Sequence, residues 1–486
     1  MTGVVATMGF LSGLRGALGA CLALFVLAGA AGAQTALFET RAKQAFMIDA
    51  ETGTVLFSKD PDAAFPPASL AKLMTMEVVF NAIRTGRLTL DDEFHVSEYA
   101  WRTGGAPSRT STMFAALGSS IRVEDLIQGV IVQSANDGCI ILAEGMAGSE
   151  ENFAQLMNER ARELGLTRSV FRNSTGLPAE GQFVTARELV QLATHIWREY
   201  PEFYRYYSQP EFTWNKILQR NRNPLLGMNI GADGLKTGYT EASGYAIAGS
   251  AERDGRRVFV AMSGMESENQ RAEEARRMIE WGMRAFDRIE LFAAGEVVGE
   301  AKTYGGAKSG VALRADGPVA IFVPITNRDR LIARIVYEGP VVAPVEEGTP
   351  IGSLKVWIGD MMSQETPLYA AESVGQGKIH QRAFDAVEEL LIGWLRWRLR
   401  ELRVDWRRQD YWCEDLAPYA LVYAYLSPAA MPELARKAWS EMRPGSVLVS
   451  YRFAIEGMPA DEIIPVGTGE DDCLHVWRFP EGADRG

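Results

Sequence analysis

The sequence predicts a multidomain chain: an α+β domain with an antiparallel sheet flanked by helices, a small all-β domain, and a C-terminal segment of strands around one helix. Three patterns carry this prediction. Hairpin-like strands alternate with apolar helical runs between residues 45 and 285, and short Val- and Ile-rich runs separated by Gly and Pro turns follow between 290 and 356. Residues 416–451 then read as strand, helix and strand. With 486 residues, 47% of them hydrophobic, the chain can bury the cores of about two to four domains.

The composition argues against some classes of function. A net charge of −12 disfavours nucleic acid as a partner. The four cysteines, at positions 21, 139, 413 and 473, form no metal-ligand or disulfide pattern, and we expect neither a metal site nor a cofactor. None of the four histidines flanks a serine-containing turn, which argues against a Ser-His-Asp enzyme, although a histidine distant in sequence could still serve.

Residues 1–33 are predicted to be a secretory signal peptide. Arg15 precedes the apolar run Ala17–Ala30, which is too short to span a bilayer, and an Ala-x-Ala site follows at 31–33. The residues before Cys21 resemble a lipoprotein cleavage site, but Cys21 lies inside the apolar run, so we expect cleavage after Ala33. The mature protein should therefore work outside the cytoplasm.

A hairpin and a buried helix are predicted at the start of the α+β domain. Residues 45–49 and 54–57 form strands around a glycine-containing turn. Pro66-Pro67 ends the extended segment, and a run of helix-forming residues begins at Ser69. This helix is apolar nearly all round as far as Phe80, so it should lie inside the domain.

Ser69 and Lys72 are a candidate nucleophile and base. Their i, i+3 spacing places both side chains on one face of the first helical turn. Burial disfavours a charged lysine and lowers its pKa, which is what a lysine general base requires. Because a serine before an apolar run is also a common helix N-cap, the pair alone does not decide the chemistry.

Ser134 and Asn136 occupy a break in an apolar region. The stretch that includes Val132 ends at Ser134-Ala135-Asn136, and a helix pattern resumes at Ile140. In a short break between helices, Ser-x-Asn would place a hydroxyl and an amide on the same side of a loop. The alternative is an ordinary helix–helix connection in which both side chains cap backbone groups.

Lys236, Thr237 and Gly238 form a third motif. The runs 244–251 and 256–264 read as strands joined by a short turn, which places the motif on or beside an antiparallel strand. Gly238 would let a ligand approach the backbone. The alternative is a glycine bulge that carries a solvated lysine and threonine.

The motifs Ser69-x-x-Lys72, Ser134-x-Asn136 and Lys236-Thr237-Gly238 occur together in this order, as they do in penicillin-binding proteins and class A β-lactamases. Over about residues 40 to 370 the chain resembles the low-molecular-mass penicillin-binding proteins, and more closely the D-alanyl-D-alanine carboxypeptidases. Further matching stretches are 46–53, 65–76, 157–158, 171–177 and 221–223. The resemblance implies a β-lactamase/transpeptidase-like α/β (α+β) catalytic domain at residues 34–288.

The resemblance also implies the roles of the catalytic residues. Ser69 would attack the peptide carbonyl between two terminal D-alanines, form an acyl-enzyme and release the last D-alanine. Lys72 would accept the serine proton. Ser134 would relay a proton toward the leaving amine, with Lys236 nearby to tune it. Asn136 would hold the amide on the acyl side of the substrate.

The remaining site residues would bind the substrate. In the family, the counterparts of Lys236, Thr237 and Arg222 bind the terminal carboxylate, and Gly238 belongs to the same strand. The backbone N–H groups of Ser69 and Tyr239 would form an oxyanion hole. The family commonly carries His where Tyr239 stands, a change that should matter little if only the backbone is used. Peptidoglycan stem peptides and β-lactams are therefore the expected partners, and penicillins would acylate Ser69 and deacylate slowly.

Three alternatives share these motifs. A class A β-lactamase needs a deacylating glutamate, and Glu180 and Glu188 lie in the required interval, but the context 175–181 matches carboxypeptidases better. A D,D-endopeptidase that cuts cross-links usually lacks a following β-domain, which this chain has. A penicillin-binding scaffold without hydrolysis is the third alternative.

Two further segments follow the catalytic domain. The β-rich domain at 289–370 contains no reactive cluster and is expected to be a stalk or docking domain. Residues 371–400 hold an amphipathic helix, clearest at 382–399, with an apolar face, aromatic rings and a cationic end. We expect it to lie in the inner-membrane surface, which makes the protein periplasmic and peripherally attached. The alternative is a helix that packs on a neighbouring domain.

Residues 401–486 depart from the family. Their strand–helix–strand pattern and the terminal strand 473–478 resemble the second half of a class I S-adenosylmethionine-dependent methyltransferase. The glycine-rich loop that would hold the cofactor is absent from the sequence, and half of a Rossmann-like sheet cannot bind it. We interpret the segment as a fusion remnant without methyl transfer. It also weakens the membrane prediction, because residues 394–408 could belong to this segment instead.

Overall fold

A computed structural model describes the chain over 38–326, 331–378, 416–417, 421–424, 431–451, 453–455, 457–465 and 473–479. The chain divides into two compact units, residues 1–387 and 388–486, and each is described by itself. The predicted signal peptide at 1–33 and the core of the predicted membrane helix, 382–399, lie outside the described residues. The wider prediction of a helix at 371–400 is wrong at its start, because residues 371–378 form bends and two bridges to the all-β domain. Among the described residues, no helix is both long enough and apolar enough to span a bilayer.

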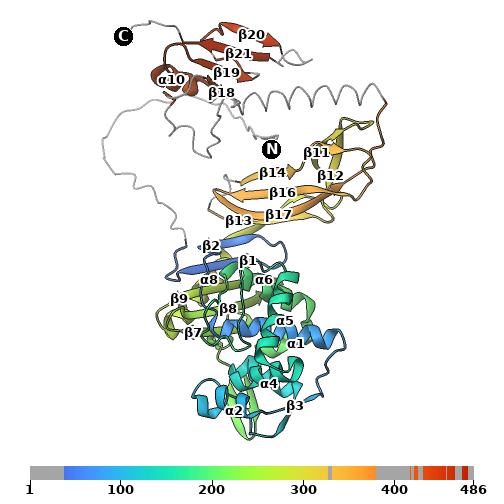
Figure 1. Cartoon of the computed structure of the whole chain (residues 1–486). Coiled ribbons are helices and arrows are strands. Elements are labelled where there is room, and N and C mark those ends of the chain that lie inside the picture. The colour runs from blue at the N-terminus through green and yellow to red at the C-terminus, as the bar shows by residue number, and fades with distance from the viewer. Residues whose placement is uncertain are drawn as a thin grey trace, which may run out of the picture. The chain divides into compact units, whose positions relative to one another are not determined.

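A five-stranded antiparallel sheet forms the centre of the first unit (Figure 1). Its order is β2-β1-β9-β8-β7, and each neighbouring pair is antiparallel. The strands are β1 Gln44–Asp49, β2 Val55–Lys59, β7 Ala232–Thr240, β8 Gly244–Arg253 and β9 Arg256–Met265. The predicted hairpin and the predicted antiparallel strand of the third motif are both confirmed.

Helices cover both faces of this sheet. Side chains alternate between faces along each strand, so that Met47 and Val260 pack with α8 Glu268–Arg284, while Phe46 and Phe259 join the larger core on the opposite face. That larger core contains α1 Lys72–Arg84, α4 Asn136–Ala147, α5 Glu150–Glu163 and α6 Ala186–Glu199. The α1 helix is buried along most of its length, as the sequence predicts.

Shorter elements connect these layers. They are η1 Ala68–Ala71, β3 Glu93–His95, α2 Glu98–Thr103, η2 Ala106–Ser108, β4 Ser120–Arg122, α3 Val123–Gln128, η3 Gly129–Gln133, α7 Pro201–Tyr204, η4 Arg205–Ser208, β5 Glu211–Trp214, β6 Ile217–Arg220 and η5 Pro224–Gly227. Strands β3 and β4 pair with each other, as do β5 and β6.

A small all-β domain follows α8, as predicted from the sequence. Strands β10 Phe286–Phe292 and β13 Val319–Pro324 pair, and a second sheet has the order β14-β16-β17-β12-β11-β15. Its strands are β11 Val297–Tyr304, β12 Gly310–Arg314, β14 Leu331–Tyr337, β15 Val341–Val342, β16 Pro350–Ile358 and β17 Met361–Ala370. Their inward side chains form a separate core.

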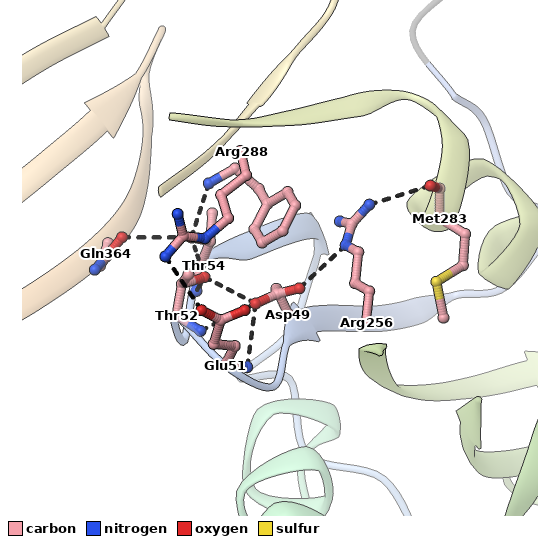
Figure 2. Close-up of polar contacts among 9 residues, drawn as sticks. Asp49, Glu51, Thr52, Thr54, Arg256, Met283, Arg288 and Gln364 are labelled. Atoms are coloured by element: carbon pink, nitrogen blue, oxygen red, sulfur yellow. Dashed lines mark hydrogen bonds and ion pairs between the residues drawn. The ribbon is translucent and has the colours of Figure 1, made fainter. Parts of the chain in front are cut away.

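A polar network joins the turn of the β1–β2 hairpin to the all-β domain (Figure 2). Thr54 Oγ1 accepts a hydrogen bond from the Phe322 backbone N–H at 3.2 Å and donates one to Gln364 Oε1 at 3.3 Å. The guanidinium of Arg256 lies 3.8 Å from the centroid of the Phe322 ring and pairs with Asp49 at 3.2 Å. Because these polar groups find partners across the junction, the hairpin holds the all-β domain in a defined position.

The second unit is a small mixed sheet with one helix. Strands β18 Leu421–Ala424 and β19 Val447–Tyr451 are parallel, and α10 Met431–Glu441 lies between them in sequence. Strand β21 Cys473–Arg478 pairs antiparallel with β19 and with β20 Glu462–Pro465. The predicted strand–helix–strand order and the terminal strand are confirmed, whereas β20 was not predicted.

Candidate active site

Ser69 lies on a tight turn directly before the buried helix α1. Residues Ala68–Ala71 form the 3-10 helix η1 and α1 begins at Lys72, so the helix predicted from Ser69 starts as a 3-10 turn. Ala68 has a positive φ of 49°, which sets the turn apart from the extended chain before it. Ser69 is partly exposed, whereas Lys72 is buried. The hydroxyl is therefore open to a substrate and the amine is not.

Three oxygen atoms surround the amine of Lys72. Its Nζ lies 3.0 Å from Ser69 Oγ, 2.7 Å from Asn136 Oδ1 and 2.5 Å from the Thr175 carbonyl oxygen. A neutral amine has two hydrogens and one lone pair. If the two hydrogens go to the carbonyl oxygens of Asn136 and Thr175, the lone pair faces the Ser69 hydroxyl. In this arrangement the lysine can accept the serine proton.

Burial lowers the pKa of Lys72 below its ordinary value of 10.5. The positive charge of Arg222 acts in the same direction, whereas the negative charges of Glu150 and Asp137 oppose it. Cys139 would oppose it only as a thiolate, but burial raises the pKa of that thiol to about 12, so it is neutral near pH 7. The lowering of the Lys72 pKa predicted from the sequence is confirmed.

Ser134 follows directly after a short π-helix, and its hydroxyl makes no hydrogen bond to a described residue. The π-helix η3 stops at Ser134, which has a φ of 64°, and α4 begins at Asn136. Ser134 is 2% exposed, and its Oγ has no hydrogen-bond partner among the described residues. Neither Ser134 nor Asn136 caps α4, since Ala135 is the N-cap residue. The alternative of an ordinary capped connection is therefore wrong.

Asn136 is held in place by the loop between η2 and β4. Its Nδ2 donates to Thr110 Oγ1 at 2.9 Å, and its backbone N–H donates to the Ser111 carbonyl at 2.8 Å. The buried carboxylate of Asp137 fixes this loop by accepting hydrogen bonds from the Thr112 hydroxyl and from two backbone N–H groups. No sequence pattern had indicated this loop, because it is joined to Asn136 only through the fold.

The third motif lies on β7, which passes beside η1, the turn that carries Ser69. At Gly238, an added Cβ would lie 3.1 Å from the Ala68 Cβ and 3.3 Å from Leu70 Cγ, so a larger residue would push against η1. The pairing of Gly238 with Ala246 is regular, and the only irregularity in the β7–β8 register lies near Gly234. The alternative of a glycine bulge at Gly238 is therefore wrong.

Cationic side chains gather around Lys236. The side chain is 3% exposed, and burial lowers its pKa well below the ordinary value of 10.5. Lys72, whenever its amine is protonated, lowers it further, as do the positive charges of Arg222 and Arg271. A carboxylate bound here would relieve this repulsion.

Arg271 is a site residue that sequence reasoning missed. It lies on α8, is 7% exposed, and its guanidinium lies 5.6 Å from the centroid of the Tyr245 ring. Tyr245 in turn lies against Tyr239, with the two ring centroids 4.3 Å apart, and Tyr239 is 52% exposed. The sequence distance between α8 and the three motifs left no local signal that could have indicated Arg271.

The fold thus brings all the predicted site residues into one region. Hydrogen bonds link Ser69, Lys72 and Asn136, and β7 lies beside η1. The backbone N–H of Arg222 donates to the Val132 carbonyl at 3.3 Å, which places Arg222 beside η3 and Ser134. Within the part of the chain that the structure describes, no group of three His, Cys, Asp or Glu residues could hold a metal ion.

Neither glutamate that could have indicated a β-lactamase contacts the lysine. Glu188 is buried in α6, where it accepts hydrogen bonds from the Arg168 backbone N–H and the Ser169 hydroxyl. Glu180 is exposed. The Thr175 carbonyl, from the same interval, is the group that reaches Lys72.

Family models match three parts of the chain. Residues 30–266 match D-alanyl-D-alanine carboxypeptidase, and residues 286–376 match the penicillin-binding protein 5 C-terminal domain. Residues 373–462 match the ANTKMT methyltransferase domain. The third match overlaps the predicted methyltransferase-like segment at 401–486, but it begins earlier and includes the predicted membrane helix at 382–399.

Individual proteins match over most of the chain. D-alanyl-D-alanine carboxypeptidase DacC of Escherichia coli (strain K12) is 34% identical over 77% of this chain and 95% of the relative. Penicillin binding protein 5 from Haemophilus influenzae is structurally similar, with a TM-score of 0.61, 32% identity, and coverage of 70% of this chain and 99% of the other. D-alanyl-D-alanine carboxypeptidase DacD from Francisella tularensis gives a TM-score of 0.57 at 27% identity, covering 70% of this chain and 95% of the other.

Proposed function

Because this chain belongs to the D-alanyl-D-alanine carboxypeptidase family, we propose that it is a serine peptidase that removes the terminal D-alanine from peptidoglycan pentapeptides. The observation that carries this proposal is the Ser69 hydroxyl 3.0 Å from the amine of a buried lysine whose other hydrogen-bond acceptors are neutral. A strongly basic ammonium could not act as a base near pH 7, whereas a lysine with a lowered pKa can.

Acylation begins at Ser69. Lys72 takes the hydroxyl proton while Oγ attacks the carbonyl carbon of the D-Ala-D-Ala bond. Asn136, which is fixed by Lys72 and Thr110, offers its amide to the acyl-side peptide group. The C–N bond to the last D-alanine then breaks. The buried, unpartnered hydroxyl of Ser134 gives a proton to the leaving nitrogen and receives in exchange the proton that Lys72 took from Ser69. Water hydrolyses the acyl-enzyme and restores Ser69.

The terminal carboxylate binds beside β7. Lys236, Thr237 and Arg222 supply the positive charge and hydrogen bonds, and Arg271 adds to the positive potential. Strand β7 is an edge of its sheet among the described residues, so its outward N–H groups are available to a substrate. The N–H groups of Ser69 and Tyr239 form the oxyanion hole, in which each donor contributes about 3 kcal/mol to the transition state.

Release of D-alanine from a pentapeptide tests this function. We expect the release of one D-alanine for each pentapeptide consumed, over many turnovers of the enzyme. A penicillin should label Ser69 covalently. No release at any pH, with labelling intact, would contradict hydrolysis and favour a penicillin-binding scaffold. Cleavage of cross-linked dimers in place of pentapeptides would favour an endopeptidase, although the all-β domain at 286–376 supports the carboxypeptidase.

The site of action is proposed to be the periplasm. The predicted signal peptide supports export, and Edman sequencing of the mature protein should give Gln34 as the first residue. Peripheral attachment to the inner membrane would use the helix at 382–399. A mature protein that starts at Met1 would contradict the export.

We propose that each domain of the chain has a separate role. We place the catalytic domain at 34–288, the β-rich domain at 289–370 and a methyltransferase-like segment at 401–486. The predicted membrane helix at 371–400 needs a later start, because Val374 and Gln376 form bridges with Val345 and Gly306 of the β-rich domain. The last segment carries half of a Rossmann-like sheet, and we propose that it transfers no methyl group. Binding of S-adenosylmethionine to the full chain, measured by calorimetry, would contradict this.

A further inference from the structure

The segment Asn173–Gly176 presents the Thr175 carbonyl to Lys72 from outside the three motifs. The preceding carbonyl, of Ser174, accepts a hydrogen bond from Thr75 Oγ1 at 2.6 Å, one helical turn beyond Lys72 on α1. At Gly176 the φ is +78°, and an added Cβ would lie 1.8 Å from the Ala68 carbonyl oxygen. The segment therefore packs tightly between α1 and η1. Its position determines the direction of one N–H bond of Lys72.

A buried carboxylate anchors this segment from the other side. Glu150, the first residue of α5, is 7% exposed. Its Oε1 accepts hydrogen bonds from the Ser174 backbone N–H at 3.0 Å and from Ser174 Oγ at 2.7 Å, and its Oε2 accepts one from the Tyr99 hydroxyl at 3.1 Å. Among the described residues, no Lys, Arg or His lies within ion-pair distance of Glu150.

Burying a carboxylate without a cationic partner costs free energy of folding. Its presence here therefore suggests a role other than stability. A neutral side chain could satisfy the Ser174 N–H as well. What Glu150 adds is a negative charge close enough to Lys72 to raise its pKa, against the dominant effect of burial. Geometry and charge of this one side chain thus both act on Lys72.

We propose that Glu150 is a positioning residue for the acylation of Ser69. It fixes Ser174 so that the Thr175 carbonyl takes one hydrogen of Lys72, and the lone pair of the amine then faces the serine hydroxyl. The inference rests on the proposed function only in its assignment of Ser69 and Lys72 as nucleophile and base.

Charged groups on several elements act on Lys72. A test of Glu150 must leave all the other groups unchanged. The titratable groups that act on Lys72, or on which it acts, are Cys139 and Asp137 on α4, Glu150 on α5, Arg222 before η5, and Lys236 on β7. Single substitutions of Glu150 leave the other four unchanged.

Two substitutions separate the geometric effect from the charge. Glu150→Gln keeps an oxygen acceptor for Ser174 and removes the negative charge. Glu150→Ala removes both. Glu151 is the matched control, because it stands in the same first turn of α5 and is exposed. Ser174→Ala removes one of the anchoring hydrogen bonds and keeps the charge.

The measurement is the second-order rate of labelling of the full chain by a fluorescent penicillin, from pH 5 to 10, with thermal unfolding of each variant. We expect Glu150→Ala to lower the plateau rate about 10- to 100-fold, because the amine loses its alignment. Glu150→Gln should keep the plateau within about threefold and move the acid limb about 0.5 to 1 pH unit lower, because the lost negative charge had favoured the ammonium. Glu151→Gln should leave both unchanged.

Two results would overturn the inference. One is a Glu150→Ala rate within twofold of the wild type at every pH. The other is an acid limb that does not move in Glu150→Gln. If Glu150→Ala does not fold, Ser174→Ala decides, with an expected plateau loss of about threefold to tenfold and an unmoved acid limb. Wild-type protein that accepts penicillin but releases no D-alanine would contradict the proposed function and leave this comparison intact.

Discussion

Helix α1 carries two buried ionisable side chains, Lys72 and Glu77, whose hydrogen-bond partners differ in charge. Lys72 is 1% exposed and Glu77 is 0% exposed. The acceptors around Lys72 are a hydroxyl, an amide oxygen and a backbone carbonyl, all of them neutral. Glu77 Oε1 instead accepts hydrogen bonds from Arg160 at 2.8 Å and from the Tyr200 hydroxyl at 2.9 Å, and His195 Nε2 lies 3.4 Å away.

The consequence is a difference in charge at the same depth. Burial lowers the pKa of Lys72, and the more distant negative charges of Glu150 and Asp137 oppose this effect without reversing it. Burial alone would raise the pKa of Glu77, but His195, Arg160 and Tyr200 outweigh it and bring the pKa below 4.5. Burial therefore does not decide whether a side chain keeps its charge. The charge of its partners does, and we propose that the neutral lysine serves the reaction whereas the charged glutamate stabilises the fold.

Replacing Lys72 should produce the largest loss of activity. Lys72→Ala removes the base, so acylation by penicillin should fall by roughly 10³-fold or more. Thermal unfolding should show a folded protein, because the lysine contributes no ion pair. Full labelling at Ser69 in the folded variant would contradict the assignment and, with it, the contrast between the two buried groups.

Replacing Glu77 should instead cost stability. Glu77→Gln leaves Arg160 without its buried partner and should lower the free energy of unfolding by about 3 kcal/mol, measured by urea denaturation. The matched control is Glu163→Gln, since Glu163 pairs with the same arginine but its side chain is 63% exposed, and it should cost less than about 0.5 kcal/mol.

The pH dependence of this stability has a definite sign. Because the folded pKa of Glu77 lies below its ordinary value of 4.5, its contribution is complete above that pH and is lost as the pH falls through the lowered folded value. Wild type and Glu77→Gln should converge in acid. A constant difference down to the lowest pH would show that packing, and not the charge, stabilises α1 here.

The rate of acylation should depend on pH in the way that Lys72 requires. If the neutral amine is the active form, the rate should rise about tenfold per pH unit on the acid side and level off below 10.5, because burial lowers the pKa of Lys72. The measurement is penicillin labelling against pH in the wild type. A rate that continued to rise up to pH 10.5 would mean that the buried lysine keeps an ordinary pKa.

The sequence predicted the parts of this site that short motifs encode. Ser69 and Lys72, Ser134 and Asn136, and Lys236 lie on the kinds of element that local pattern indicates: a helix start, a break between helices and a strand. The apolar pattern of α1 was also enough to predict that Lys72 is buried. These features depend on a few consecutive residues, which is why sequence alone could reveal them.

The partners of the buried groups could not be predicted in this way. The Thr175 carbonyl reaches Lys72 across 103 residues of sequence, and Arg160 reaches Glu77 across 83. Arg271 lies on α8 with no motif around it. Such pairings follow from how the helices pack on the sheet, and a backbone carbonyl such as that of Thr175 leaves no trace in residue identity.

Replacing Tyr239 should have the smallest effect on the rate. It tests whether an exposed side chain matters as much as the buried Lys72 and Glu77. Its ring is 52% exposed and carries no charge, so only its backbone N–H should take part in the reaction. Tyr239→His should therefore change the rate of penicillin labelling by less than about threefold at pH 8, where an ordinary imidazole is neutral. The lost contact with Tyr245 should lower stability by at most about 1 kcal/mol. Tyr239→Ala is the control, since it keeps the N–H without any ring. A tenfold loss in both variants would mean that an exposed ring, and not only buried groups, helps to set the rate.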